Sequence, residues 1–227
     1  MVFGNESRHN CGVHWVEQNG VRLAKPVAGH PALELCNTWA GWDEDPPPGS
    51  GDPRREWLPD YDTLAVWSGF HGLLDAPQAA RLRAAGVASP GKAEAVLAEV
   101  RALRLRVRAA LLAPEDETAL AGLTGYVRRA AAVSELVPGD GHARWQVDAD
   151  VGLELPLLGL AWSAAGLLAS DDVRYVHACP GAECGWLFLD RRGRRRWCDM
   201  AVCGNRAKVA AHARRTRSSA ATGRASD

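Results

Sequence analysis

The sequence predicts an α+β protein: a mainly helical N-terminal domain with a small antiparallel sheet, followed by a small C-terminal four-cysteine module made of a β-hairpin and a helix. Three observations support this fold class. Long segments between residues 60 and 170 place apolar residues three or four positions apart, as amphipathic helices do. Short alternating apolar runs flank turn residues, which indicates hairpins. Four cysteines are concentrated near the C-terminus, and 227 residues can hold one sizeable core and a small appended module.

The N-terminal third begins with a hairpin signal. Asn19-Gly20 lies between two alternating apolar runs, and this dipeptide favours the tight turn of a two-residue loop. Further along, apolar residues at helical spacing run into EDPPPGSGDP, which cannot continue a helix. In chain order we expect a hairpin at residues 13–23, a helix at 32–42, a flexible surface loop at 44–53 and a helix from Asp60 or Asp62 to about Leu74.

The longest expected helix covers residues 90–113, because Ser89 and Pro90 are favoured at the N-cap and first turn. An arginine stripe on the side away from its apolar face is expected to be solvated or paired with acids. Residues 156–170 are nearly all apolar but too few to cross a bilayer, which indicates a buried central helix. The arginines of the stripe are Arg101, Arg104 and Arg108. The other expected elements are a helix at 116–132, a turn-and-strand passage at 135–148 and a strand at 173–176.

The net charge of zero conceals a division along the chain. Residues 1–173 carry 15 Lys and Arg against 23 Asp and Glu, a balance of −8, whereas residues 174–227 carry 12 against 4, a balance of +8. A basic segment of this kind is typical of a nucleic-acid-binding surface, although a solvated charged face looks similar in a sequence.

The C-terminal cysteines form two C-x4-C pairs separated by thirteen residues. Thiolates suit Zn²⁺, and four protein ligands leave no open coordination position for water, so we expect one structural zinc per chain. His177, two residues before the first pair, is a competing ligand that four cysteines make unnecessary. The expected ligands are Cys179, Cys184, Cys198 and Cys203.

Disulfides are the alternative for these cysteines, and they would need an oxidising compartment. The chain opens MVFGNESRHN without the features of an export signal, and no apolar run reaches the length of a membrane span. We therefore expect a cytoplasmic protein without membrane association, in which Cys11 and Cys36 are free thiols.

Basic residues run through the four-cysteine module. Residues 186–189 and 194–197 flank the turn at 190–193, which predicts a hairpin with arginine at its tip. A helix is expected at 205–215, with Gly204 in a tight turn and Asn205 as its cap, and residues 218–227 are expected to be disordered. Arginine and lysine here can bind DNA phosphates. The candidate DNA-binding residues are Arg191, Arg192, Arg194, Arg195, Arg196, Arg206 and Lys208.

The run Cys203-Gly204-Asn205-Arg206, together with the upstream C-x4-C pair, resembles the CGNR zinc-finger family of bacterial proteins. In that family the finger usually follows a domain called ABATE, and members are generally described as candidate stress-induced transcription regulators. Residues 30–38, HPALELCNT, are similar to the opening segment of ABATE. The resemblance implies an ABATE-like sensing or dimerisation domain at residues 1–173 and a CGNR-type zinc finger at 174–217.

These observations favour a DNA-binding transcription regulator. The alternative is a small-ligand-binding protein or an enzyme whose pocket lies in the first domain, with the finger as a structural or protein-docking module. No recognised nucleophile, carboxylate-pair or phosphate-loop signature is present, which favours a protein that is not an enzyme. Duplex DNA is the expected partner, and a small-molecule effector and a homodimer stay open. The candidate pocket residues are His30, Asn37, Thr38, Trp39, Trp42 and His71.

Overall fold

The computed structural model describes residues 13–42, 44–45, 47–48, 52 and 55–223, with side chains as far as Arg217. The predicted loop at 44–53 lies largely outside these residues, as does Cys11. The elements in chain order are β1 (Trp15–Gln18), β2 (Val21–Ala24), α1 (Pro31–Cys36), α2 (Tyr61–Phe70), α3 (Ala76–Ala88), α4 (Pro90–Leu112), α5 (Glu117–Ala132), β3 (Ser134–Pro138), β4 (Ala143–Val147), the 3-10 helix η1 (Ala149–Glu154), α6 (Leu155–Leu168), the 3-10 helix η2 (Asp171–Tyr175), β5 (Val176–Ala178), β6 (Leu187–Leu189), the π-helical turn η3 (Met200–Gly204) and α7 (Asn205–Gly223).

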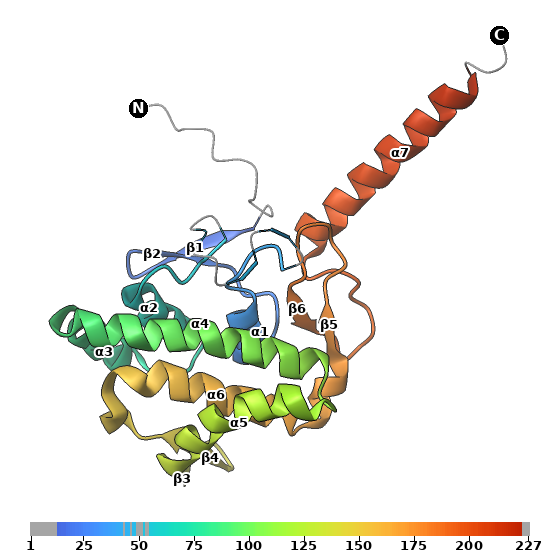
Figure 1. The fold of residues 1–227 in the computed structure, drawn as a ribbon. Helices are drawn as coiled ribbons and strands as arrows, with labels where there is room; N and C mark the ends of the chain where they lie inside the picture. Colours follow the sequence, from blue (N-terminus) through green and yellow to red (C-terminus); the bar gives the residue numbers. More distant parts are fainter. Residues whose placement is uncertain (1–12, 43, 46, 49–51, 53–54, 224–227) are drawn as a thin grey trace, which may run out of the picture.

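The helices form a layered body around α4 (Figure 1). Helices α1, α2, α5 and α6 all pack against α4, and α6 also packs against α1 and α5. The β5–β6 pair stands at one end of this body, while α7 projects away from it (Figure 1). The α+β class is therefore confirmed, with three separate two-stranded antiparallel sheets among the described residues.

The first hairpin forms as predicted. Strands β1 and β2 pair antiparallel from Trp15 opposite Ala24 to Gln18 opposite Val21. Asn19 and Gly20 have φ angles of 49° and 81°, the left-handed pair that a two-residue turn of this kind requires. The second hairpin, β3–β4, confirms the predicted turn-and-strand passage.

Helices α2, α4, α5 and α6 confirm their predicted positions, with one difference in length. Helix α2 begins at the Asp60 cap, whose carboxylate accepts from Thr63 N at 2.7 Å, but it ends at Phe70 and not at Leu74. The chain leaves the helix through Gly72, whose φ of 73° is a left-handed conformation that ends helices.

Helix α3 was not expected, because its apolar residues are mostly alanine and give little periodic signal. Its first turn nevertheless has the sequence signature of a capping box. Asp75 accepts from Gln78 N at 2.7 Å, and the Gln78 side chain accepts from Asp75 N at 2.8 Å. The helix packs mainly against α2.

Helix α1 is shorter than the predicted helix at residues 32–42. It ends at Cys36, because the residues that follow make contacts that a continuing helix would not allow. Thr38 Oγ1 donates to Leu35 O at 2.6 Å, and Trp39 forms an isolated antiparallel bridge with Glu56. The chain therefore turns toward the residues that precede α2.

Helix α6 is the buried central helix that the sequence predicts. The stretch Ala149–Leu168 has the length and mean hydropathy of a membrane span. It consists of two helices, however, and α6 itself has 14 residues, about 21 Å against the roughly 30 Å of a bilayer core. Because α6 packs against α1, α4 and α5, it is a core helix of the folded body.

The arginines of the α4 stripe form hydrogen bonds within the protein, and one of them is buried. Arg104 is only 1% exposed and forms a two-pronged pair with Glu56, with N–O distances of 2.8 and 2.5 Å, and it also donates to Thr38 Oγ1. Arg101 donates to the carbonyl of Leu58, and Arg108 donates to that of Gly185. Pairing with acids was one of the two expected alternatives and is confirmed at Arg104. The burial of Arg104 was not expected, and it arises because the segment before α2 folds over this side of α4.

Two predictions for the C-terminal part are also wrong. Residues 171–175 form the 3-10 helix η2, and the predicted strand at 173–176 starts only at Val176. Helix α7 continues to Gly223, whereas a helix ending at about 215 was expected; residues 224–227 of the expected tail lie outside the described part of the chain. The sequence after Thr216 contains no proline or glycine before Gly223, so no helix-breaking residue stops the helix there.

Candidate metal centre and basic module

The four predicted ligands meet at one point. Their sulfur atoms all lie within 4.8 Å of one another, and all four residues are buried. The Sγ–Sγ distances from Cys198 to Cys184 and to Cys203 are both 3.6 Å. Thiolates at about 2.3 Å from a tetrahedral zinc lie about 3.8 Å apart, so the cluster has the dimensions of a Cys₄ zinc site. His177 is exposed and packs on Phe188, outside this cluster.

The first cysteine pair lies in the loop between β5 and β6. Cys179 N donates to Trp186 O at 2.7 Å, and Cys184 N donates to Gly181 O at 3.1 Å, so the backbone bends around the metal position. A Cβ atom on Gly181 would lie 3.1 Å from Cys203 Sγ and 3.4 Å from Cys179 Sγ. Gly181 is a residue of the site that the sequence analysis missed, although a glycine between two ligands was the available signal.

The hairpin of the module differs from the predicted one. Strand β6 pairs with β5, from Ala178 opposite Leu187 to Val176 opposite Leu189, and residues 194–197 form no strand. Asp190 is the cause, because its carboxylate accepts from Arg192 N at 3.3 Å and from Arg195 N at 2.7 Å. These bonds fold the chain back into a loop and leave no extended return strand.

The second cysteine pair is carried by the turn η3. Asp199 caps this turn by accepting from Ala201 N at 2.7 Å. Gly204 lies in this turn, as predicted, but its φ is not left-handed. A Cβ atom there would collide with the Met200 sulfur and lie 3.2 Å from the Trp197 ring, so glycine is needed for close packing.

The last two residues of the CGNR run also stabilise the turn η3 and the second cysteine pair. Asn205 has helical angles and is not an N-cap; its Nδ2 donates to Ala201 O at 2.9 Å and closes the π-helical turn. Arg206 Nη2 donates to Cys203 Sγ at 3.4 Å, a contact that offsets negative charge on a thiolate ligand. Each residue of the run therefore has a structural role at the junction of metal site and helix.

The candidate DNA-binding residues fall into two groups. Three of them form hydrogen bonds within the chain: Arg191 pairs with Asp172, Arg195 donates to Val27 O at 2.8 Å, and Arg206 contacts Cys203. A fourth, Arg196, lies 5.1 Å from the centre of the Trp197 ring. The hydrogen bond from Arg191 holds the pKa of Asp172 below its usual range. The other group is exposed at the surface of the module and consists of Arg192, Arg194, Arg196 and Lys208.

The module is joined to the helical body by buried hydrogen bonds. Asn37 Nδ2 donates to Leu187 O at 2.9 Å, and Leu187 N donates to Asn37 Oδ1 at 2.8 Å. Trp186 Nε1 donates to Trp39 O at 3.0 Å. Leu187 and Leu189 of β6 belong to the same hydrophobic core as the helices. The metal module is therefore packed into the body and shares its core.

The six candidate pocket residues do not surround one ligand-sized cavity. Asn37, Thr38 and His71 line a cavity of about 10 Å³, which is room for about one water molecule. Trp39 is fully buried, and Trp42 packs under Arg108 at 4.2 Å. The sixth residue, His30, caps α1 by accepting from Ala32 N.

Burial shifts the acid-base behaviour of groups around this small cavity. It raises the pKa of Glu34 to about 7, although the Ala28 and Gly29 N–H groups that bond its carboxylate oppose the shift. Burial lowers the pKa of His71 to about 4 and also lowers that of His30. The protein interior where the helical body meets the zinc module therefore favours uncharged side chains.

Fold and site together define a class: a helical α+β protein with an integral four-cysteine zinc module. Comparison with known families identifies the family of the chain. Residues 29–171 match the ABATE family, described as "Putative stress-induced transcription regulator", and residues 175–216 match the CGNR zinc finger. The chain belongs to the ABATE family and carries a CGNR zinc finger with one structural zinc. A search of the curated proteins found no match.

Proposed function

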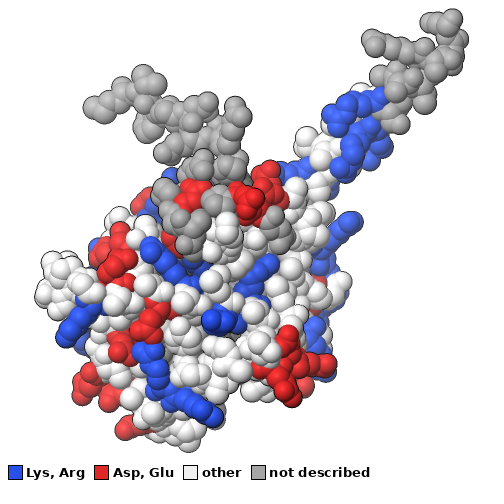
Figure 2. All heavy atoms as spheres, in the orientation of Figure 1, with Lys and Arg blue, Asp and Glu red and all other residues white. Residues whose placement is uncertain are grey.

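We propose that this protein is a cytoplasmic transcription regulator that binds duplex DNA through its zinc module and α7, with residues 1–173 as a sensing domain and 174–217 as the DNA-binding finger. The observation that supports this most strongly is the basic surface of the module. The sequence between Asp199 and Asp227 contains no acidic residue, and the exposed arginines after Asp190 continue onto α7. Figure 2 shows Lys and Arg side chains along α7, where it leaves the body.

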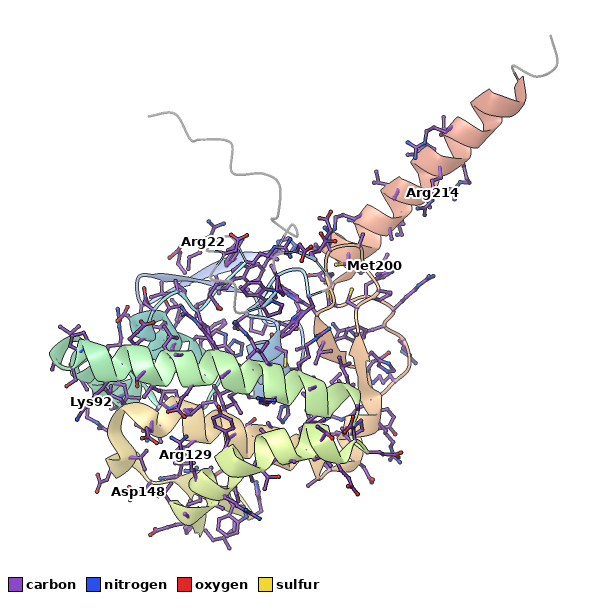
Figure 3. The ribbon with its side chains drawn as sticks, in the orientation of Figure 1. Arg22, Lys92, Arg129, Asp148, Met200 and Arg214 are labelled. Atoms are coloured by element: carbon purple, nitrogen blue, oxygen red, sulfur yellow. The ribbon has the colours of Figure 1, made fainter. Side chains whose placement is uncertain are left out.

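The position of α7 suits contact with a duplex. It has 19 residues, about 28 Å of helix, and Figure 3 shows that Arg214 lies on its projecting part. At about 100° per residue, Arg214 and Arg217 lie on one flank while Lys208 and Arg215 lie on the opposite flank. Because a DNA groove has a phosphate backbone on each side, a helix with two basic flanks can contact both strands.

The arrangement favours phosphate contacts over base recognition. Helix α7 carries several arginines of like charge as it projects from the body, and neutralisation by phosphates would stabilise it in the complex. If about four to six phosphates are neutralised, the logarithm of the affinity falls against the logarithm of salt concentration with a slope of about −4 to −5.

The test is a salt titration of binding to a duplex of mixed sequence. Replacing Arg194 and Arg196 with alanine should reduce the steepness of the slope by up to about two units and leave the zinc content unchanged. The matched control replaces Arg128 and Arg144, exposed arginines on α5 and β4, and should leave the slope as it is. Absence of duplex binding at low salt by the zinc-loaded protein would exclude this function and favour a finger that docks onto another protein.

A further inference from the structure

A cleft lies on the helical body beside the first hairpin, apart from the residues assigned to DNA. Its volume is about 440 Å³, within the range of small-molecule sites. Figure 3 shows Arg22 at this edge of the protein. The cleft is formed by the β1–β2 hairpin, the segment before α2 and the first turn of α2, and its lining includes Trp15, Arg22, Glu56, Trp57, Asp60 and Asp62.

Aromatic surface forms one part of the lining. The rings of Trp15 and Trp57 lie 4.8 Å apart at an angle of 58°, and the Arg22 guanidinium lies 4.6 Å from the centre of the Trp15 ring. The two rings and the guanidinium therefore form an aromatic and cationic edge of the cleft.

The charged groups of the lining differ in how far they are already paired. Glu56 is held by Arg104, and Asp62 pairs with Arg83 at 2.6 Å. Asp60 uses one oxygen to cap α2 and is exposed. Arg22 is exposed, and its guanidinium lies over the Trp15 ring. The cleft therefore presents an available carboxylate and an available guanidinium in one place.

We propose that this cleft binds a small zwitterion of the α-amino acid type with an apolar side chain. The ligand's carboxylate would pair with Arg22, its ammonium group would pair with Asp60, and its side chain would pack on Trp57. Because Glu56 and Asp62 are already paired with Arg104 and Arg83, a simple anion would leave Asp60 without a cationic partner, and a simple cation would leave Arg22 without an anionic one. A zwitterion provides an oppositely charged partner for both Arg22 and Asp60.

The same residues connect the cleft to the metal module. The ring of Trp57 meets that of Trp186 edge-on at 5.2 Å, and Trp186 packs in the cluster that contains the zinc ligands. A ligand on Trp57 therefore lies one aromatic contact away from the module, and its binding should change the tryptophan fluorescence of the whole protein.

The test uses three probes with the zinc-loaded full chain: L-phenylalanine, phenethylamine, which lacks the carboxylate, and 3-phenylpropanoate, which lacks the ammonium group. Calorimetry should show L-phenylalanine binding at least about tenfold more tightly than either of the others, because each lacks one charge-assisted contact. No binding of L-phenylalanine, or equal affinity for phenethylamine, would overturn the proposal.

Two variants separate the charges. Arg22→Ala should weaken L-phenylalanine and 3-phenylpropanoate about tenfold but leave phenethylamine unchanged. Asp60→Asn, which keeps a capping side chain, should weaken L-phenylalanine and phenethylamine but leave 3-phenylpropanoate unchanged. Asp75→Asn makes the same change at the cap of α3, outside the cleft, and should alter none of the three affinities. Equal weakening of all probes by Arg22→Ala or Asp60→Asn would mean a merely structural effect and would refute the assigned contacts.

Discussion

The joint between helical body and zinc module can be tested at Asn37. Its amide exchanges two hydrogen bonds with the backbone of Leu187, and both residues are almost completely buried. Asn37→Ala removes both bonds, at about 1 kcal/mol each, and leaves a buried N–H and a buried C=O unsatisfied, at about 1–3 kcal/mol each. Because these costs partly overlap, we expect the free energy of unfolding to fall by about 2–5 kcal/mol.

Urea denaturation of the zinc-saturated protein, followed by tryptophan fluorescence, measures this loss. Leu187 lies between the two cysteine pairs, so zinc affinity should fall with it, by between about tenfold and a hundredfold in competition with a chelator. Asn205→Ala is the matched control, because it removes an exposed amide bond inside the module and should cost about 1 kcal/mol or less. A loss below about 0.5 kcal/mol for Asn37→Ala, with unchanged zinc affinity, would show that body and module are energetically independent.

Three further predictions concern the proton binding of Glu34, the packing of Gly204 in the turn η3, and the division between helical body and zinc module. Because the pKa of Glu34 is raised from 4.5 to about 7, the folded state binds more protons than the unfolded state between these values, and stability falls as pH rises through them. Glu34→Gln should remove this fall, so denaturation between pH 5 and pH 8 should show the variant gaining about 3 kcal/mol relative to the natural protein. Gly204→Ala should lower zinc affinity, measured with a chelator, since its methyl group displaces Met200; an unchanged affinity would contradict the packing argument. Truncation after Asp172 removes Leu187 and Leu189 from the core, so the fragment should lose cooperative thermal unfolding; a cooperative transition would mean that the helical body folds independently of the zinc module.

Local signals in the sequence predicted most of the elements. Asn19-Gly20 and Ser89-Pro90 specify their turn and helix start through the backbone angles that these residues favour. The two cysteine pairs predicted the metal cluster, because ligand type and spacing are themselves local. The charge division likewise located the basic module.

Contacts between distant segments were beyond the reach of such signals. The sequence left open whether Arg104 is solvated or paired with an acid, because its partner Glu56 lies 48 residues earlier. Arg195 and Arg206 read as candidates for DNA contact, since a sequence does not show which arginines bond to carbonyls or thiolates of the same chain. The hairpin at 186–197 was misplaced because one side chain, Asp190, bonds two backbone N–H groups of its own loop.

The joint at Asn37 also bears on how proteins of this kind can be recombined. The two family matches divide between residues 171 and 175, yet the acceptors for Leu189 N and for the Trp186 indole belong to Ala28 and Trp39, far upstream. A finger transplanted at that division would arrive without the groups that complete its strand. A working chimera has to carry residues 27–42 together with the finger. The part that can be exchanged between proteins therefore consists of two separate segments of the chain and cannot be obtained by joining at one position.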